Sequence, residues 1–120
     1  MNAEEWDRGH LWRFRARLVR VIDADTWVVE ADTGFSGRHE VHIRIAEMNA
    51  PESSTPEGAV ATAAVIRLLN TIPPSFAWPL RIVSRQRERS VAEVRSFERF
   101  VADVSVVQAD GTLRDAKDLL

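Results

Sequence analysis

The residue types that could do chemistry lie in two short segments, residues 23–26 (Asp-Ala-Asp-Thr) and residues 44–52. The first supplies two carboxylates, and the second supplies Arg44 and Glu52. Carboxylates are hard oxygen ligands of the kind that Ca²⁺ takes, and a glutamate can accept a proton from an attacking water. A guanidinium can bind a phosphate through two parallel hydrogen bonds, and Arg99 would add a second one. Together these residues have the composition of a metal-dependent site for phosphodiester cleavage.

Each of these residues also has a plain structural explanation. Asp23 and Asp25 are ordinary turn residues between strands, and Glu52 could simply place negative charge near a helix N-terminus. Arg44 could be a solvated arginine on a strand, and Arg99 could pair with a neighbouring glutamate. The joint site is favoured because all of them occur in one order at compatible spacing.

The elements expected around these residues are those of a small barrel. Residues 12–18 alternate apolar and polar side chains, as a half-buried strand does. The phase of the alternation shifts after residue 18, which predicts a β-bulge or a sharp coil of the strand. Residues 27–29 and 41–45 form the next two strands, joined by a hairpin turn at residues 34–37. Because the odd-numbered residues of the third strand are apolar and face the core, Arg44 is expected to point outward.

A helix is expected after the third strand, at residues 57–70, with Ser54 and Glu57 at capping-box spacing. A pair of prolines ends it. Apolar alternation then predicts two further strands, in residues 80–82 and 100–106. The fold class is therefore α+β, mainly β: a five-stranded OB-fold-like barrel with one full helix after strand three and a short C-terminal helix.

Length and composition indicate a single domain. The 120 residues contain no cysteine and carry a net charge of −2, and we assign residues 1–10 to a polar N-terminal tail and residues 11–120 to the barrel domain. The acidic start has no hydrophobic run behind it, and no stretch reaches membrane-span length, so we expect a cytoplasmic protein without a membrane partner. The segment 113–120 looks like the beginning of a helix. Either it packs back onto the barrel, or it leaves an apolar groove that a second copy fills, and its leucines favour the possible homodimer.

A nucleic-acid partner would need a local basic surface, because the chain has no overall positive charge to neutralise phosphates. Arginines are dense in residues 81–99, although glutamates interrupt them, so a solvated charged segment is an equal alternative. Trp6 and Trp27 are the tryptophans expected to be exposed for stacking. The three histidines show neither zinc spacing nor a nucleophilic triad.

Three stretches, residues 20–26, 43–52 and 97–100, resemble the signatures of the staphylococcal nuclease-like (thermonuclease) family. Their order and spacing agree with that family over roughly residues 12–120. The resemblance implies an OB-fold and an enzyme that cleaves DNA and RNA by attack of a water, with one Ca²⁺.

The resemblance also implies roles for individual residues. Arg44 and Arg99 would bind the scissile phosphate, and Glu52 would be the general base, so these three are the predicted catalytic residues. The calcium ligands would be the side chains of Asp25 and Asn49 and the backbone carbonyl of Ala50. Beside the ligands, Asp23 and Thr26 would complete the site.

Several positions depart from the family pattern. Asn49 stands where the family has a second calcium carboxylate, so calcium is expected to bind weakly. Ser96 and Phe97 replace a lysine and a tyrosine, and Glu98 replaces a small residue. We therefore predict a calcium-dependent nuclease for DNA or RNA, weakened by Asn49. The alternative is a degenerate nuclease-like OB-fold module that binds nucleic acid or a protein without cutting.

Overall fold

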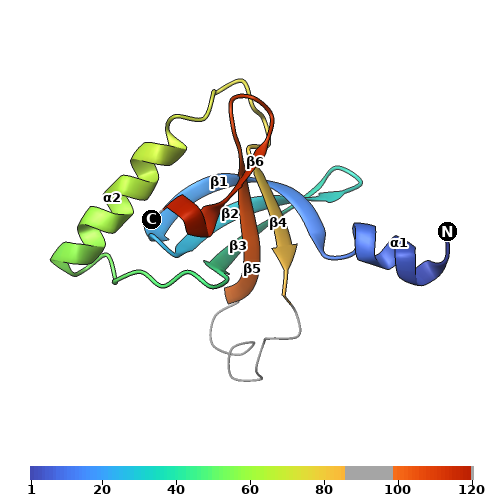
Figure 1. Ribbon diagram of the computed structural model, residues 1–120, viewed down its shortest axis with the longest axis horizontal. Helices are drawn as coiled ribbons and strands as arrows, with labels where there is room; N and C mark the ends of the chain where they lie inside the picture. The colour runs from blue at the N-terminus through green and yellow to red at the C-terminus, as the bar shows by residue number, and fades with distance from the viewer. Residues whose placement is uncertain (86–98, 120) are drawn as a thin grey trace.

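The computed structural model describes residues 1–85 and 99–119, and a closed five-stranded barrel lies at its centre (Figure 1). The barrel strands are β1 (Arg13–Asp23), β2 (Thr26–Gly34), β3 (Gly37–Ile45), β4 (Leu80–Ser84) and β5 (Arg99–Val107). They follow one another in the order β3-β2-β1-β4-β5, and β5 closes the barrel by pairing in parallel with β3. A helix follows the third strand, so the architecture is compatible with an OB-fold and the predicted α+β fold class is confirmed.

The predicted bulge in β1 bends this strand, which pairs with both β2 and β4. The β1–β2 register shifts between Leu18 and Arg20, which leaves Val19 as the extra residue. A bulge increases the local twist and bends its strand. The N-terminal half of β1 consequently pairs on both sides, as Ala16 lies opposite Ala31 of β2 and Leu80 of β4.

The register of the hairpin between β2 and β3 determines which side chains of β3 face the core. Gly34 pairs with Gly37 across the turn, as predicted, and Arg44 lies opposite Thr26 at the other end of the ladder. Ile43 and Ile45 are 1% exposed, whereas the Arg44 side chain is 46% exposed. The expected outward direction of Arg44 is therefore confirmed.

Helix α2 (Pro56–Leu69) begins at a different cap from the one predicted. Thr55, rather than Ser54, is the N-cap, and its hydroxyl oxygen accepts a hydrogen bond from the Gly58 amide at 3.0 Å. The reason is that Pro56 takes the first helical position, where its fixed φ and missing N–H are both tolerated. Only Gly58, Val65 and Leu69 of this helix are buried.

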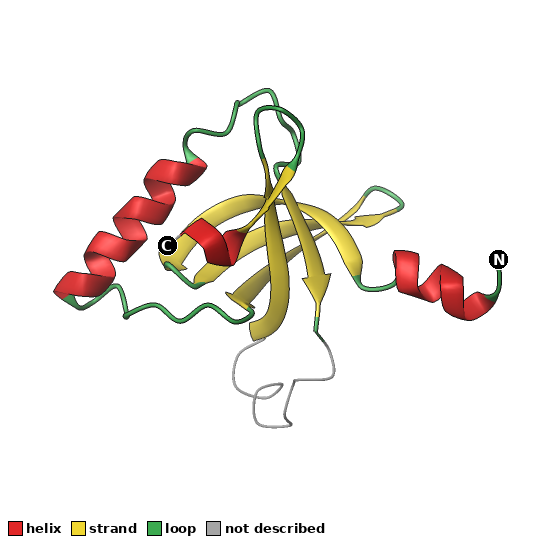
Figure 2. Cartoon of the chain, in the orientation of Figure 1, coloured by secondary structure: helices red, strands yellow, loops and turns green. Residues whose placement is uncertain are grey.

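Residues of the N-terminal tail form a helix, α1 (Ala3–His10), which was not predicted. Asn2 caps it by accepting from the Glu5 amide at 2.8 Å, and the Trp6 ring stacks on His10 at 4.6 Å. No residue of α1 is buried, and Figure 2 shows it projecting from the barrel on the side away from α2.

The tryptophan prediction was half right. Trp6 is 49% exposed, but Trp27 is fully buried in the core, so its expected exposure was wrong. The indole N–H of Trp27 donates to the Ala24 carbonyl at 3.0 Å, which satisfies its one polar group inside the barrel.

The C-terminal segment packs back onto the barrel. A short strand, β6 (Leu113–Asp115), pairs with the end of β5, and only the single 3-10 turn η2 (Ala116–Leu119) is helical. The helix expected from residue 113 thus starts three residues later, because the free edge of β5 at residues 105–107 takes up the intervening residues as a strand. Ala116 is fully buried, and Leu119 packs against the core.

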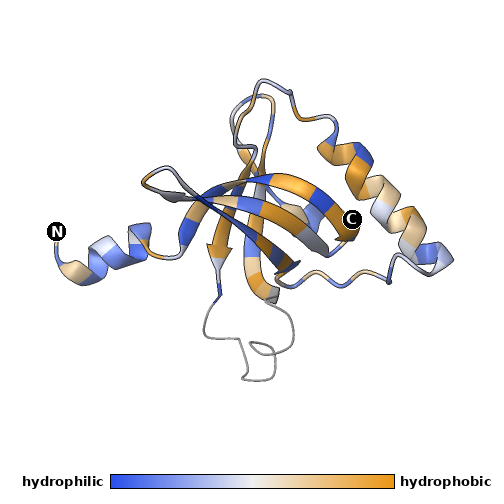
Figure 3. Cartoon of the chain, turned by 180° about the vertical axis from the view of Figure 1, so that it is seen from behind, coloured by the Kyte–Doolittle hydropathy of each residue, from blue (hydrophilic) through white to orange (hydrophobic). Residues whose placement is uncertain are grey.

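The core fills the barrel and extends under the middle and the C-terminal end of α2, through Val65 and Leu69. Its largest fully buried side chains include Trp27, Ile43, Ile45 and Leu80. Figure 3 shows hydrophobic residues along the strands and over much of α2, while α1 is mostly hydrophilic. Within the described residues, no helix is both long and apolar enough to cross a membrane.

Candidate functional site

Two segments that are distant in the sequence are joined by hydrogen bonds from aspartates to backbone amides. Asp23 Oδ1 accepts from the Ser53 amide at 2.7 Å, and Asp25 Oδ2 accepts from the Ala50 amide at 3.2 Å. The β1–β2 turn and the loop after β3 therefore lie side by side. A carboxylate that accepts a hydrogen bond from a backbone N–H is held in a fixed orientation.

Arg44 lies between two of the predicted calcium ligands. Its Nη2 donates to Asn49 Oδ1 at 2.8 Å and lies 3.8 Å from Asp25 Oδ2. The hydroxyl of Thr26, which pairs with Arg44 across β2 and β3, donates to Asp25 Oδ1 at 3.2 Å. The structure thus brings together five of the predicted site residues: Asp25, Thr26, Arg44, Asn49 and Ala50.

Glu52 is fixed through its backbone and leaves its side chain exposed. Its carbonyl oxygen accepts from both the amide and the hydroxyl of Thr55, at 3.0 and 2.7 Å. A Cβ at Gly58 would lie 1.6 Å from the same oxygen, so only glycine fits there. Within the described part of the chain, the Glu52 carboxylate makes no hydrogen bond or ion pair, and it is open to water.

Arg99 is described only through its backbone. It begins β5, where it lies opposite His42 of β3, two residues before the Val101–Arg44 pair. Its side chain lies outside the described part of the chain, as do Ser96, Phe97, Glu98 and the basic residues Arg87, Arg89 and Arg95.

Sequence reasoning missed a second arginine beside Arg44. Arg85 follows β4 directly, and its amide donates to the Val101 carbonyl at 2.9 Å. With Arg44, Asn49 and Glu47 it lines a hollow of about 200 Å³. The only sequence signal for Arg85 was its membership of the basic stretch, which does not show that β4 ends next to Arg44.

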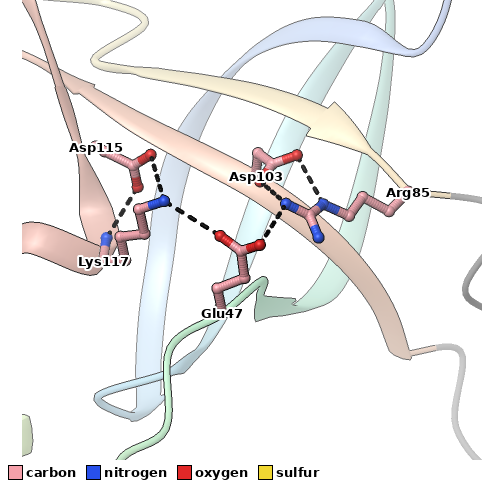
Figure 4. Close-up of polar contacts among 5 residues, drawn as sticks. All are labelled: Glu47, Arg85, Asp103, Asp115 and Lys117. Atoms are coloured by element: carbon pink, nitrogen blue, oxygen red, sulfur yellow. Dashed lines mark hydrogen bonds and ion pairs between the residues drawn. The ribbon is translucent and has the colours of Figure 1, made fainter.

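Arg85 belongs to a polar network that anchors the loop after β3 (Figure 4). Its guanidinium donates to Asp103 through two hydrogen bonds of 2.9 and 2.6 Å, and lies 3.7 Å from Glu47 Oε1. On the other side, Lys117 Nζ donates to Glu47 Oε2 at 3.2 Å and lies 3.9 Å from Asp115. The C-terminal turn and β5 are thereby tied to the loop that carries Asn49.

The network shifts the pKa values of two of its members, Glu47 and Lys117. The hydrogen bond and the charge of Lys117, with a further contribution from Arg85, lower the pKa of Glu47 below its ordinary value. The same contact with Glu47 raises the pKa of Lys117. Both groups are therefore charged across neutral pH, and the ion pair persists there.

The oxygen types at the site fit a calcium ion, but their charge is low. Asp25 supplies the carboxylate, Asn49 an amide oxygen and Ala50 a carbonyl, all of them hard ligands. Asn49 Oδ1 already accepts from Arg44. Among residues 1–85 and 99–119, no three His, Cys, Asp or Glu side chains are grouped to hold a metal ion. Calcium affinity is consequently expected to be weak.

Comparison with known proteins does not extend this description. No known protein family matches the sequence, and no curated protein matches it.

Proposed function

We propose that the chain is a staphylococcal nuclease-like OB-fold protein that hydrolyses phosphodiester bonds in DNA or RNA with calcium. One observation supports the proposal: Arg44 of β3 contacts both Asp25 of the β1–β2 turn and Asn49 of the loop after β3, and Asp25 also accepts from the amide of Ala50. The segment that bears Glu52 is hydrogen-bonded to the same turn through Asp23. A carboxylate, an amide and a guanidinium thus lie together on the outside of the barrel, and the proposed general base belongs to a segment that is bonded to the same turn.

Each side chain of the proposed site has its own role in hydrolysis. Arg44 is exposed enough for its guanidinium to bind a phosphate oxygen and to stabilise the charge that grows during attack. Glu52 accepts the proton of the attacking water. Calcium, held by Asp25, Asn49 and the carbonyl of Ala50, would polarise the phosphoryl oxygen. Arg99 is proposed as the second phosphate-binding arginine.

The test is digestion of single- and double-stranded DNA and RNA, with calcium and with EDTA. We expect cleavage only with calcium, and a loss of about 10²- to 10⁴-fold in Glu52→Gln. Glu57→Gln is the matched control, because it removes an exposed glutamate five positions away and should cleave like the wild type. Equal cleavage by the wild type and Glu52→Gln would sink the proposal.

A second candidate, binding of nucleic acid without cleavage, is favoured by the Arg44–Asn49 hydrogen bond. In this arrangement the guanidinium occupies the amide oxygen that would ligate calcium, and the site holds one ligand carboxylate. If this candidate is right, oligonucleotides bind equally well in EDTA and in calcium, Arg44→Ala weakens that binding, and no product appears.

A further inference from the structure

Three arginines converge on one tryptophan away from the candidate site. The guanidinium carbons of Arg15, Arg17 and Arg38 lie 5.0, 5.2 and 5.6 Å from the ring centre of Trp78. Cations within about 6 Å of an indole ring are attracted by its π-electrons. Trp78, which precedes β4, therefore positions side chains from β1 and β3.

Two carboxylates lie beneath these arginines. Arg15 Nε is 2.6 Å from Asp32, and Arg17 Nη2 is 2.6 Å from Glu30, which also lies 3.6 Å from Arg38. The acidic side chains are 20% and 25% exposed, whereas those of the three arginines are 42–55% exposed. The acids hold the arginines from below, and the guanidiniums form the outer layer.

The outer layer retains most of its hydrogen-bonding capacity. Each guanidinium carries about five N–H donors, and within the described residues one nitrogen of each is paired with Asp32 or Glu30, which leaves most of the donors available. Arg81 lies opposite Arg15 on the neighbouring strand and adds positive charge to the same face. The face therefore has a local excess of cations in a chain whose net charge is negative.

Phe35 stands at the rim of this face without a structural role. It is fully exposed, at 108% of its reference area, and its φ is +54° in the β2–β3 turn. A bulky residue pays a steric penalty at positive φ, where Gly or Asn is preferred. With Arg15, Arg38 and Trp78 it lines a polar surface hollow of about 470 Å³. A strained aromatic side chain with no burial has no benefit for folding, which points to a ligand.

We propose that this surface, made of Arg15, Arg17, Phe35, Arg38 and Trp78, binds single-stranded nucleic acid. The arginines neutralise backbone phosphates, and the Phe35 ring stacks on a base. Stacking requires the open face of a base, which a duplex keeps inside and an acidic peptide lacks. The inference goes beyond the proposed hydrolysis, since this binding needs neither calcium nor Glu52.

The surface and the candidate site share one side of β3. Arg38 and Arg44 are six residues apart with the same strand parity, so both point outward, roughly 20 Å from each other along the strand. A single strand bound at Phe35 therefore lies on the side of the barrel that carries Arg44.

The experiment measures binding of a labelled oligo-dT strand by fluorescence anisotropy in EDTA, so that hydrolysis cannot interfere. Phe35→Asn should weaken binding about 5- to 150-fold, while its unfolding temperature stays equal or rises because the turn strain is relieved. Arg38→Gln should weaken binding and lower the salt slope by roughly one. Arg67→Gln, an exposed arginine on α2, is the matched control and should bind like the wild type.

Three results would overturn the inference. One is wild-type affinity in Phe35→Asn, and another is equal affinity for duplex DNA or for a polyglutamate peptide. The third is complete loss of binding in Arg44→Ala together with unchanged binding in Arg38→Gln, which would place the strand at the candidate site alone.

Discussion

At the scale of single residues, Arg44 links the two oxygens that a calcium ion would need. Its hydrogen bond to Asn49 and its position near Asp25 hold both side chains toward one point. If calcium binds at this proposed site, the positive charge of Arg44 would oppose that of the ion near the amide oxygen of Asn49.

Asn49→Asp should tighten calcium binding. A unit charge pair a few Å apart has an interaction energy of roughly 4 kcal/mol at an effective dielectric of about 20. The new carboxylate would interact with both Arg44 and calcium, so calcium would gain only part of this energy. We expect at least a tenfold gain in affinity by titration calorimetry, and faster hydrolysis. Asn70→Asp, at the far end of α2, is the control. Equal affinities of wild type and Asn49→Asp would mean that residue 49 is not a calcium ligand.

The sequence could predict those features of the site that follow from backbone geometry. Arg44 is outward because its apolar neighbours Ile43 and Ile45 are inward, and strand parity leaves no other choice. The hydrogen bond from Arg44 to Asn49 depends on side-chain rotamers, which no pattern of residue types specifies. Arg85 was missed for a related reason, since its proximity to Arg44 follows from where β4 ends against β5.

At the scale of elements, the start of α2 is locked to the segment that bears Glu52. Gly58 packs against the Glu52 carbonyl so closely that a Cβ would overlap it. The Thr55 cap binds the same carbonyl through its amide and hydroxyl. Helix α2 therefore serves as the support that orients the proposed general base.

Gly58→Ala should disturb both stability and hydrolysis. The added methyl group has to push the Glu52 carbonyl away, which we expect to cost about 1–3 kcal/mol of unfolding free energy and to reduce cleavage by moving Glu52. Gly9→Ala is the matched control, because a Cβ at Gly9 meets nothing within 4 Å. Chemical denaturation measures the first effect. An unchanged midpoint for Gly58→Ala would contradict the close packing.

The Glu47–Lys117 pair should make stability depend on pH. The pKa of Glu47 is lowered in the folded state, so its contribution is present above its unfolded value of about 4.5 and is lost as the pH falls through the folded pKa. The pKa of Lys117 is raised, so its contribution is complete below 10.5 and is lost at higher pH.

Glu47→Gln should therefore be less stable than the wild type at pH 7, and the difference should shrink as the pH falls below 4.5. Thermal unfolding at several pH values measures this. Glu57→Gln, which lies in the first turn of α2, serves as the control. A difference that does not change between pH 7 and pH 3 would show that the ion pair of Glu47 is not its source.

Sequence patterns predicted the elements that bury one face, because burial of one face requires a regular spacing of apolar residues. The bulge at Val19 follows from a phase shift that a barrel strand can accommodate only in this way. Helix α1 has no buried residue, so its sequence carries no apolar periodicity from which the helix could be predicted. The cap formed by Asn2 and Glu5 is its only recognisable signal among the described contacts. Strand β6 exists because β5 offers it a free edge, which is a property of the assembled sheet.

At the scale of the whole molecule, helix α2 leaves three large apolar side chains exposed, Val60 on its outer side and Ile66 and Leu68 on opposite flanks. Val60 is 70% exposed, Ile66 41% and Leu68 36%. Beside the end of the helix, Leu68, Val106 and Leu119 line a hollow of about 330 Å³. Exposed apolar surface of this kind is penalised by water unless another surface covers it.

We therefore expect the chain to form a homodimer through the side of α2 that carries Val60 and the adjoining flank that carries Ile66. Multi-angle light scattering at micromolar concentration should give about twice the monomer mass, and Val60→Glu with Ile66→Glu should return it to the monomer mass. Arg67→Glu is the matched control, because it changes the charge of the same exposed side without removing apolar area. The C-terminal turn already packs on the barrel, so self-association does not depend on that segment finding a partner. A monomer mass for the wild type at every concentration, or a dimer mass that survives the double substitution, would mean that this side of α2 does not bind a second copy.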